Sequence, residues 1–136
     1  MRAVLLDTNA YAAFMLGTVE IVEVIAHADS LLMNSIVLGE LLGGFAAGTR
    51  EAANRAQLAR FLDSPRVEVI AVTAQTADSY ALIYSGLRRK GQPIPTNDLW
   101  IAASALERGA GLLTRDAHFR QVEGLRCGQC LADFLP

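Results

Sequence analysis

The chain has 136 residues, the length of one domain, so we expect a single domain over residues 1–136. Hydrophobic residues make up 52% of it, yet no apolar run reaches the ~18 residues of a membrane span. The segment before Asp7 is too short for a signal peptide, so we expect a cytoplasmic protein with no membrane partner. A net charge of -2 argues against a globally basic nucleic-acid binder, so an RNA partner would need local arginines or bound cations.

Short strand-like runs alternate with longer helical segments along the chain. In order, we expect a strand at 3–6, helices from about residue 8 and at 18–28, a strand at 31–33, helices at 35–48 and 50–63, a strand at 67–72, a helix at 74–90, a helix from about 97 to 108, and strands at 111–114 and 125–127. Strands separated by helices, each a nearly continuous apolar run, predict a three-layer α/β/α fold with a central, mainly parallel sheet of about five strands.

Two aspartates follow predicted strands. Asp7 ends the first strand, and Asp116 lies two residues beyond the strand at 111–114. Ligands bind at the carboxyl ends of the strands in open α/β sheets, so both are candidate site residues. Aspartate is also common wherever a strand passes into a turn, and either residue taken alone fits that structural role equally well.

Glu40 lies in an apolar stretch of its predicted helix. Its neighbours at i-4, i-3, i+3 and i+4 are Ile36, Val37, Gly43 and Gly44, and none of them can pair with a carboxylate. A buried or cleft-facing carboxylate without a basic partner is costly unless a cation or a proton neutralises it. Glu40 is therefore a candidate functional residue.

Asp98 opens an otherwise apolar helix in the stretch PIPTNDLWIAASA. Its structural interpretation is helix-end electrostatics, in which Thr96 or Asn97 caps the helix and the carboxylate contributes about 0.3–1 kcal/mol. The three other candidate carboxylates, Asp7, Glu40 and Asp116, favour a functional interpretation of Asp98 instead. If Asp7, Glu40, Asp98 and Asp116 converge, their oxygens form a hard-cation site suited to Mg²⁺ or Mn²⁺ and to phosphodiester hydrolysis. Polar neighbours, among them Thr8, Asn9, Asn97 and Thr114, could support such a site.

Four other features have a structural interpretation that we favour. Cys127 and Cys130 form a C-x-x-C, but its place in the last ten residues suits neither a thioredoxin-like pair nor a zinc site, so we interpret them as free structural thiols. His118 is interpreted as structural or solvent-facing rather than phosphate-binding. Tyr80, Tyr84 and Trp100 are interpreted as core or dimer contacts, and the basic run Arg88, Arg89 and Lys90 as complementing a helix dipole.

Four motifs in order resemble those of PIN-domain ribonucleases, and most closely the VapC-type toxins of VapBC toxin-antitoxin systems. They are LLDTNAY at the start, GE at Glu40, TNDLWIAASA, and LLTRDAHF near the end, and they span essentially the whole chain. The resemblance implies that Asp7, Asp98 and Asp116 surround the metal, with Glu40 as a further ligand or a group that orients water. It matches Asn9 and Thr114 to supporting polar positions. The CGQC segment has no counterpart in the family pattern.

The resemblance further implies an Mg²⁺- or Mn²⁺-dependent endoribonuclease that forms homodimers and is silenced by a VapB-like antitoxin. Three alternatives remain: a PIN-like domain that binds RNA or a partner without cutting, a PIN nuclease outside toxin-antitoxin systems, and a receiver-like or phosphatase-like protein. The last is disfavoured because Asn9 stands where a second aspartate would be needed and no lysine follows Lys90. The sequence does not specify the RNA target, the number of metal ions or the identity of the antitoxin.

Overall fold

A five-stranded parallel sheet forms the centre of the computed structural model, which describes residues 2–136. The strand order is β3-β2-β1-β4-β5, and each paired strand runs parallel to its neighbour. The strands are β1 (Ala3–Leu6), β2 (Ser30–Asn34), β3 (Val67–Ile70), β4 (Gly111–Leu113) and β5 (Cys127–Gly128). The predicted α/β class with a parallel sheet of five strands is confirmed.

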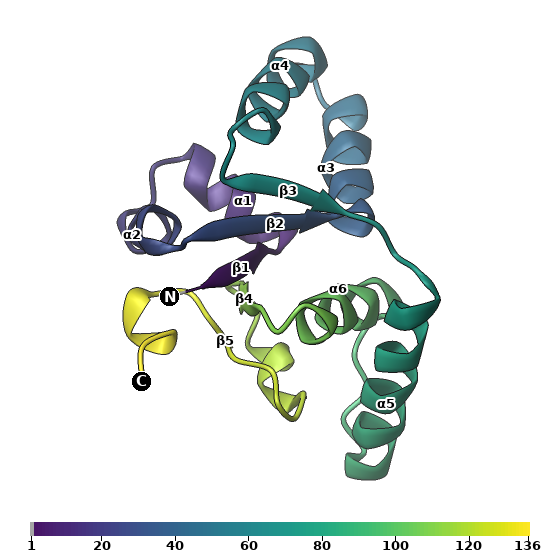
Figure 1. Ribbon diagram of the computed structural model, residues 1–136. Helices are drawn as coiled ribbons and strands as arrows, with labels where there is room; N and C mark the ends of the chain where they lie inside the picture. The colour runs from purple at the N-terminus through teal and green to yellow at the C-terminus, as the bar shows by residue number, and fades with distance from the viewer. Residues whose placement is uncertain (1) are drawn as a thin grey trace.

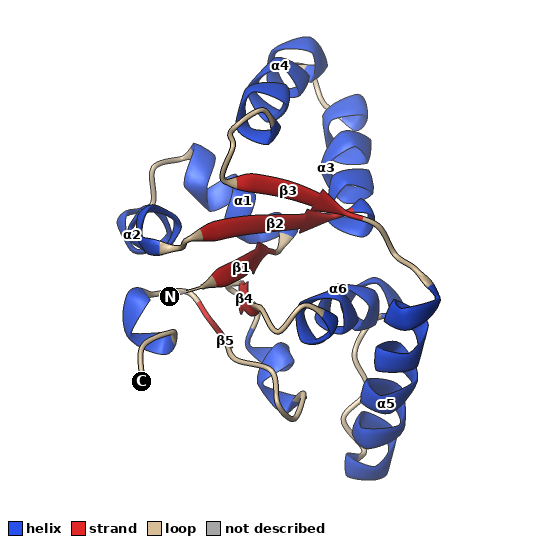
Figure 2. Ribbon diagram, viewed as in Figure 1, coloured by secondary structure: helices blue, strands red, loops and turns tan. Residues whose placement is uncertain are grey.

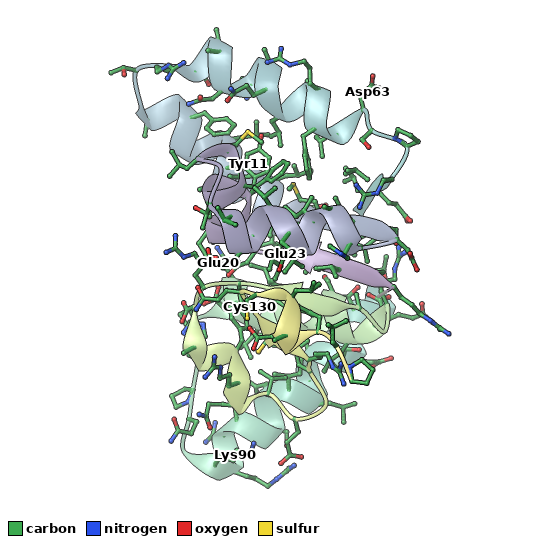
Figure 3. The ribbon with its side chains drawn as sticks, turned by 90° about the vertical axis from the view of Figure 1, so that its left-hand side faces the viewer. Tyr11, Glu20, Glu23, Asp63, Lys90 and Cys130 are labelled. Carbon is green, nitrogen blue, oxygen red and sulfur yellow. The ribbon has the colours of Figure 1, made fainter. Side chains whose placement is uncertain are left out.

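Six α-helices flank this sheet in the described part of the chain (Figures 1 and 2). They are α1 (Thr8–Met15), α2 (Val19–His27), α3 (Ser35–Ala47), α4 (Glu51–Leu62), α5 (Ala74–Lys90) and α6 (Thr96–Glu107), and two short 3-10 helices, η1 (Ala117–Gln121) and η2 (Leu131–Asp133), follow β4 and β5. The ends of α4 and α5, marked by Asp63 and Lys90, lie at opposite ends of the molecule (Figure 3).

No single helix within residues 2–136 is long and apolar enough to cross a membrane, although α1 and α2 meet the length and composition criteria as a pair bent by 106°.

The inner strands form the core because both faces of each are covered. Leu5, Leu6, Met33, Leu112 and Leu113 are all essentially inaccessible to solvent. Such continuous apolar runs are typical of parallel strands buried on both sides, which is why the sequence pattern located them.

The edge strands differ from the sequence prediction. β3 ends at Ile70 rather than at residue 72, and β5 covers Cys127–Gly128 rather than 125–127. β5 pairs with β4 only through Leu112↔Cys127 and Leu113↔Gly128. The extent of so short an edge strand is decided by its hydrogen-bonding partner rather than by its own side chains, so the apolar pattern misplaced it.

The register between β1 and β4 aligns the ends of these two strands at the functional edge of the sheet. Leu6 lies opposite Leu113, and the backbone N–H of Asp7 donates to the carbonyl oxygen of Leu113 at 3.0 Å. The residues that follow the two strands, Asp7 and Thr114, therefore lie side by side, although 107 positions separate them in the sequence.

Candidate active site

Asp7 is held rigidly where β1 passes into α1. One carboxylate oxygen, Oδ1, accepts a hydrogen bond from the backbone N–H of Thr8 at 2.8 Å, so Asp7 is also the N-cap of α1. The other oxygen, Oδ2, accepts from the hydroxyl of Thr114 at 2.7 Å. With only 5% of the residue exposed, Asp7 has little freedom to move.

Asn9 and Thr114 connect the ends of β1 and β4. The amide nitrogen of Asn9 lies 3.3 Å from Asp7 Oδ2 and 3.4 Å from the Thr114 hydroxyl, and its amide oxygen accepts from the backbone N–H of Arg115 at 3.0 Å. The Thr114 hydroxyl also accepts from the backbone N–H of Asp116 at 3.0 Å. These bonds fix the loop that carries Asp116 relative to Asp7.

Glu40 reaches the same edge from α3, and both of its carboxylate oxygens accept hydrogen bonds from other elements. The Thr8 hydroxyl donates to Oε1 at 2.5 Å, and the Asn97 amide donates to Oε2 at 3.3 Å. Glu40 thus has no partner in its own helix, as its sequence neighbours predicted, but it contacts residues that begin α1 and α6.

Asp98 lies in the first turn of α6, and the predicted cap before it is wrong. The helix begins at Thr96 after Pro95, and no side-chain cap is formed. Thr96 is inside the helix, and Asn97 donates its amide to Glu40 rather than accepting from a backbone N–H of the helix. The Asp98 side chain is 18% exposed and is aimed at the site, where its Oδ2 lies 2.8 Å from His118 Nε2.

A buried asparagine, which the sequence analysis did not single out, sets the positions of α3 and α6. Asn34 accepts a bond from the backbone N–H of Val37 at 2.9 Å and so caps α3, while its amide donates to Ser104 of α6 at 3.0 Å. Because Asn34 is fully buried, both bonds are protected from water. The helices that carry Glu40 and Asp98 are thereby attached to the end of β2.

His118 lies between two of the carboxylates, so its ring has a definite structural place in the cleft, and the expectation that it does not bind phosphate stays a prediction. Its Nε2 is 2.8 Å from Asp98 Oδ2, and its Nδ1 is 3.0 Å from Asp116 Oδ1. Both ring nitrogens of His118 thus face carboxylate oxygens, one of Asp98 and one of Asp116. One sequence feature could have indicated this position. His118 follows Asp116 by only two residues, and the 3-10 helix η1 turns its ring toward the cleft.

The electrostatics of the cleft disfavour ionised carboxylates. The pKa of Asp7 is raised by burial, against the lowering effect of its bonds from Thr114 and Thr8, and the charges of Glu40 and Asp116 raise it further. The pKa of Asp98 is raised by burial and then by the charge of Asp7, while the adjacent His118 lowers it. The charges of the four predicted carboxylates thus act on one another in this cleft, although only Asp98 and Asp116 form a tight group there, together with His118.

This donor set fits a divalent metal ion. Single ligand atoms of Asp98, Asp116 and His118 lie within 4.8 Å of one another, and Asp7 acts electrostatically on Asp98. Carboxylate oxygens are the ligands that hard cations such as Mg²⁺ and Mn²⁺ prefer, and a cation would relieve the repulsion that raises these pKa values.

The CGQC segment forms a separate turn at the C-terminus. Cys127 and Cys130 are free thiols, and the thiol of Cys130 lies 3.3 Å from a carboxylate oxygen of Asp133. The short helix η2 that follows this turn contacts α2. The expectation that both cysteines are free thiols holds in this structure.

The aromatic and basic residues of α5 lie on the outer side of the molecule. Tyr80 packs against Trp100 of α6 with ring centroids 4.3 Å apart and stacks on Tyr84 at 6.3 Å, while Tyr84 is 46% exposed. Arg88 donates to the Tyr84 hydroxyl at 3.2 Å and Arg89 to the Ser85 hydroxyl at 2.7 Å. Both arginines thus bind within the last turns of their own helix.

Comparisons with known proteins agree with this geometry. The family model described as the PIN domain matches residues 4–125. The chain is 32% identical over 128 residues to "Ribonuclease VapC1" of Haemophilus influenzae (strain R2866), which covers 90% of this chain and 93% of that protein. It is 38% identical over 82 residues, 60% of this chain, to "Ribonuclease VapC4" of Mycobacterium tuberculosis, and this match spans 62% of that protein's length.

A solved structure has the same fold over nearly the whole chain. It is VapBC2 from Rickettsia felis, bound to a DNA fragment from the promoter, and it aligns with a TM-score of 0.82 and 26% identity over 94% of this chain and 98% of that chain. The family model matches most of the sequence, and the motifs behind the resemblance contain the carboxylates of the cleft described above. The chain therefore belongs to the PIN-domain family, among the relatives of the VapC proteins.

Proposed function

We propose that this chain is a single PIN domain that acts as a metal-dependent endoribonuclease and hydrolyses phosphodiester bonds of RNA. The observation that carries the proposal is the convergence of four carboxylates from four different segments at one edge of the sheet. They are Asp7, Glu40, Asp98 and Asp116, and the pKa values of Asp7 and Asp98 are raised there by burial and by neighbouring negative charge. The names of the VapC relatives support the same activity.

The four carboxylates would hold Mg²⁺ or Mn²⁺. When bound, such an ion lowers the pKa of a water molecule and stabilises the negative charge that develops on a phosphodiester. Asp7 presents a fixed oxygen because Thr8 and Thr114 hold its carboxylate in place. Asn9 and Thr114 act as supports, since they fix the Asp116 loop without facing the reacting groups themselves.

Glu40 and His118 have distinct roles in this proposal. Glu40 is either a further ligand or the group that orients the attacking water, and its bonds from Thr8 and Asn97 determine its position. His118 lies between Asp98 and Asp116, so its ring would share their oxygens with any cation that they hold. With a metal bound, His118 would either give up one of these contacts or serve as a further ligand.

The test is cleavage of single-stranded RNA by purified protein in Mn²⁺ and in EDTA, with Glu40→Gln as the variant. We expect cleavage in Mn²⁺ only, and a loss of at least tenfold in Glu40→Gln. Glu51→Gln, on the exposed first turn of α4, is the matched control and should cleave like the wild type. A folded wild-type protein that leaves RNA intact in Mn²⁺ and in Mg²⁺ would overturn the proposal in favour of a binding domain without nuclease activity.

We also propose that the chain is the toxin of a toxin-antitoxin pair, is a homodimer and acts in the cytoplasm. The relevant support is that solved neighbours are VapBC complexes, in which a VapC-type protein is found with its antitoxin. Expression of the chain alone in bacteria should arrest growth, and Glu40→Gln expressed at the same level should not. Normal growth of cells that contain folded wild-type protein would contradict the toxin role. The alternative would then be a PIN nuclease outside toxin-antitoxin systems.

A further inference from the structure

A small hollow lies next to Asp116. Arg115, Arg120 and Gln129 line it together with Asp116 and the end of β5 at Gly128, and its volume is about 30 Å³. The hollow lies where the loops after β4 and β5 meet, at the same sheet edge as the four carboxylates. It therefore adjoins the proposed catalytic site and shares only Asp116 with the proposed metal-binding set.

The two arginines of this hollow have no side-chain partners within residues 2–136. Arg115 takes part only through its backbone N–H, which donates to Asn9, and both arginine side chains are exposed. By contrast, several arginines elsewhere are engaged: Arg66 with two backbone carbonyls, Arg88 and Arg89 within α5, Arg108 with Glu68, and Arg126 with the carbonyl of Phe134. The hollow thus presents two uncommitted guanidinium groups beside a cleft that is otherwise acidic.

Asp133, the carboxylate in the turn after β5, is already bound by backbone groups. Its Oδ2 accepts from the backbone N–H of Gln129 at 2.9 Å and of Cys130 at 3.2 Å. These bonds lower the pKa of Asp133, and the charge of Arg120 lowers it slightly further without a close ion pair. Asp133 thus fixes the backbone that forms the floor of the hollow and leaves Arg120 free to bind a ligand.

Gly128 makes this floor possible. A Cβ at Gly128 would lie 2.3 Å from the side-chain atoms of Asp133, closer than real side chains approach. The glycine therefore lets Asp133 close the turn after β5 against the sheet. In this structure CGQC is a tight turn that shapes the hollow, which gives the segment a role other than redox or zinc chemistry.

We propose that this hollow binds one phosphate group of the RNA next to the phosphodiester that is cut, and that Arg115 and Arg120 position the strand through it. This inference rests on the proposed ribonuclease function. A volume of about 30 Å³ admits one or two water-sized atoms, so an oxygen of a phosphate fits and a nucleobase does not. Guanidinium groups match phosphate in charge and in hydrogen-bond geometry, and phosphate contacts fix the register of a nucleic acid without reading its sequence.

Because the hollow shares Asp116 with the carboxylate cluster, a phosphate held there would lie next to the group of ligands that would hold the metal. The arginines would also offset the repulsion between RNA and an acidic cleft, which the overall charge of -2 cannot do. They are positioning residues, so their loss should weaken binding more than it slows the chemical step.

The test compares two double variants that remove the same charge. Arg115→Gln/Arg120→Gln alters the hollow, and Arg88→Gln/Arg89→Gln alters two exposed arginines at the end of α5. A fluorescein-labelled RNA decamer is titrated in EDTA at rising NaCl and followed by anisotropy, and cleavage of the same decamer is measured in Mn²⁺. We expect at least fivefold weaker binding and a fivefold higher KM for the hollow variant than for the α5 variant, with kcat within about threefold of the wild type.

The salt dependence separates a phosphate contact from a general loss of structure. Loss of one phosphate contact should flatten the slope of log Kd against log[NaCl] by about 0.7 for a single strand, and Arg115→Lys/Arg120→Lys should restore much of the slope. Equal binding, KM and slope in the two double variants would overturn the inference, and so would a wild type that does not bind the decamer. A wild type that binds through the hollow but never cleaves would refute the proposed nuclease activity and leave the hollow in place.

Discussion

Two carboxylate environments at the same sheet edge behave in opposite ways. In the cleft, the pKa values of Asp7 and Asp98 are raised by burial and by neighbouring negative charge. In the turn after β5, the pKa of Asp133 is lowered by backbone N–H donors from Gln129 and Cys130. Asp133 is thus a carboxylate that stabilises the fold, whereas Asp7 and Asp98 are ionised only at a cost in stability. Carboxylates of this second kind are characteristic of functional sites.

The largest expected effect is the loss of cleavage in Asp98→Asn. Asparagine keeps the shape and the helix-end position but removes one negative charge from the cleft, so metal affinity should fall and RNA cleavage in Mn²⁺ should drop by about 100-fold or more. The metal-free melting temperature should hold or rise, because one source of repulsion is gone.

Asp78→Asn on α5 is the control for that variant, since Asp78 is exposed and far from the cleft. A metal-free Asp98→Asn protein that is less stable than Asp78→Asn and fully active would mean that Asp98 only complements the dipole of α6. Asp98 would then be a carboxylate that only stabilises the fold, as Asp133 is.

The second prediction concerns stability at the other carboxylate. Asp133→Asn should lower the free energy of unfolding by about 1–3 kcal/mol at pH 7, because a charged acceptor for two backbone N–H groups becomes a neutral one. For a chain of this size that is a loss of roughly 4–10 °C in melting temperature. Metal binding by calorimetry should be unchanged, and a variant as stable as the wild type would remove the contrast between the two environments.

The pH dependence of stability sharpens the same contrast. Because the folded-state pKa of Asp98 lies above its ordinary value of 3.8, the metal-free protein should lose stability as the pH rises from that value through the raised pKa. The melting temperature of Asp98→Asn minus that of the wild type should therefore be near zero at pH 3.5 and should grow toward pH 7. We expect a difference of a few degrees.

The pH dependence of stability that Asp133 contributes has the opposite sign. Its folded-state pKa is below 3.8, so its stabilisation is present above that value and is lost as the pH falls through the lowered pKa. The deficit of Asp133→Asn should consequently shrink on acidification. Parallel pH profiles for the two variants would contradict the assignment of opposite environments.

The smallest expected effect is that of Cys127→Ser/Cys130→Ser. Neither thiol belongs to the carboxylate cluster, and a serine at 130 can still donate to Asp133 in place of the thiol. Cleavage and metal affinity should stay within about twofold of the wild type, and the melting temperature should change by only a few degrees. A large loss of activity in the folded double variant would show a catalytic role for CGQC.

The order of helices and strands followed directly from the sequence because each inner strand is a short apolar run buried on both faces, as at Leu5 and Leu112. The four carboxylates could be picked out as candidates, since a strand end or an apolar helix gives a carboxylate no local partner, and their role as one metal site stays a prediction. The limits of β3 and β5 were misplaced because an edge strand extends only as far as its neighbour pairs with it.

Sequence by itself determined the fold class and the residue types available for chemistry, because both depend on local composition and on periodic burial. Tertiary structure alone decided which distant groups touch: His118 between Asp98 and Asp116, Asn97 on Glu40 rather than on its own helix, and Asn34 between α3 and α6. It also brought two unpaired arginines to the hollow beside Asp116. Such contacts depend on strand order and register, which bring distant side chains within 2.8–3.3 Å of one another, and no pattern of neighbours along the chain encodes that distance.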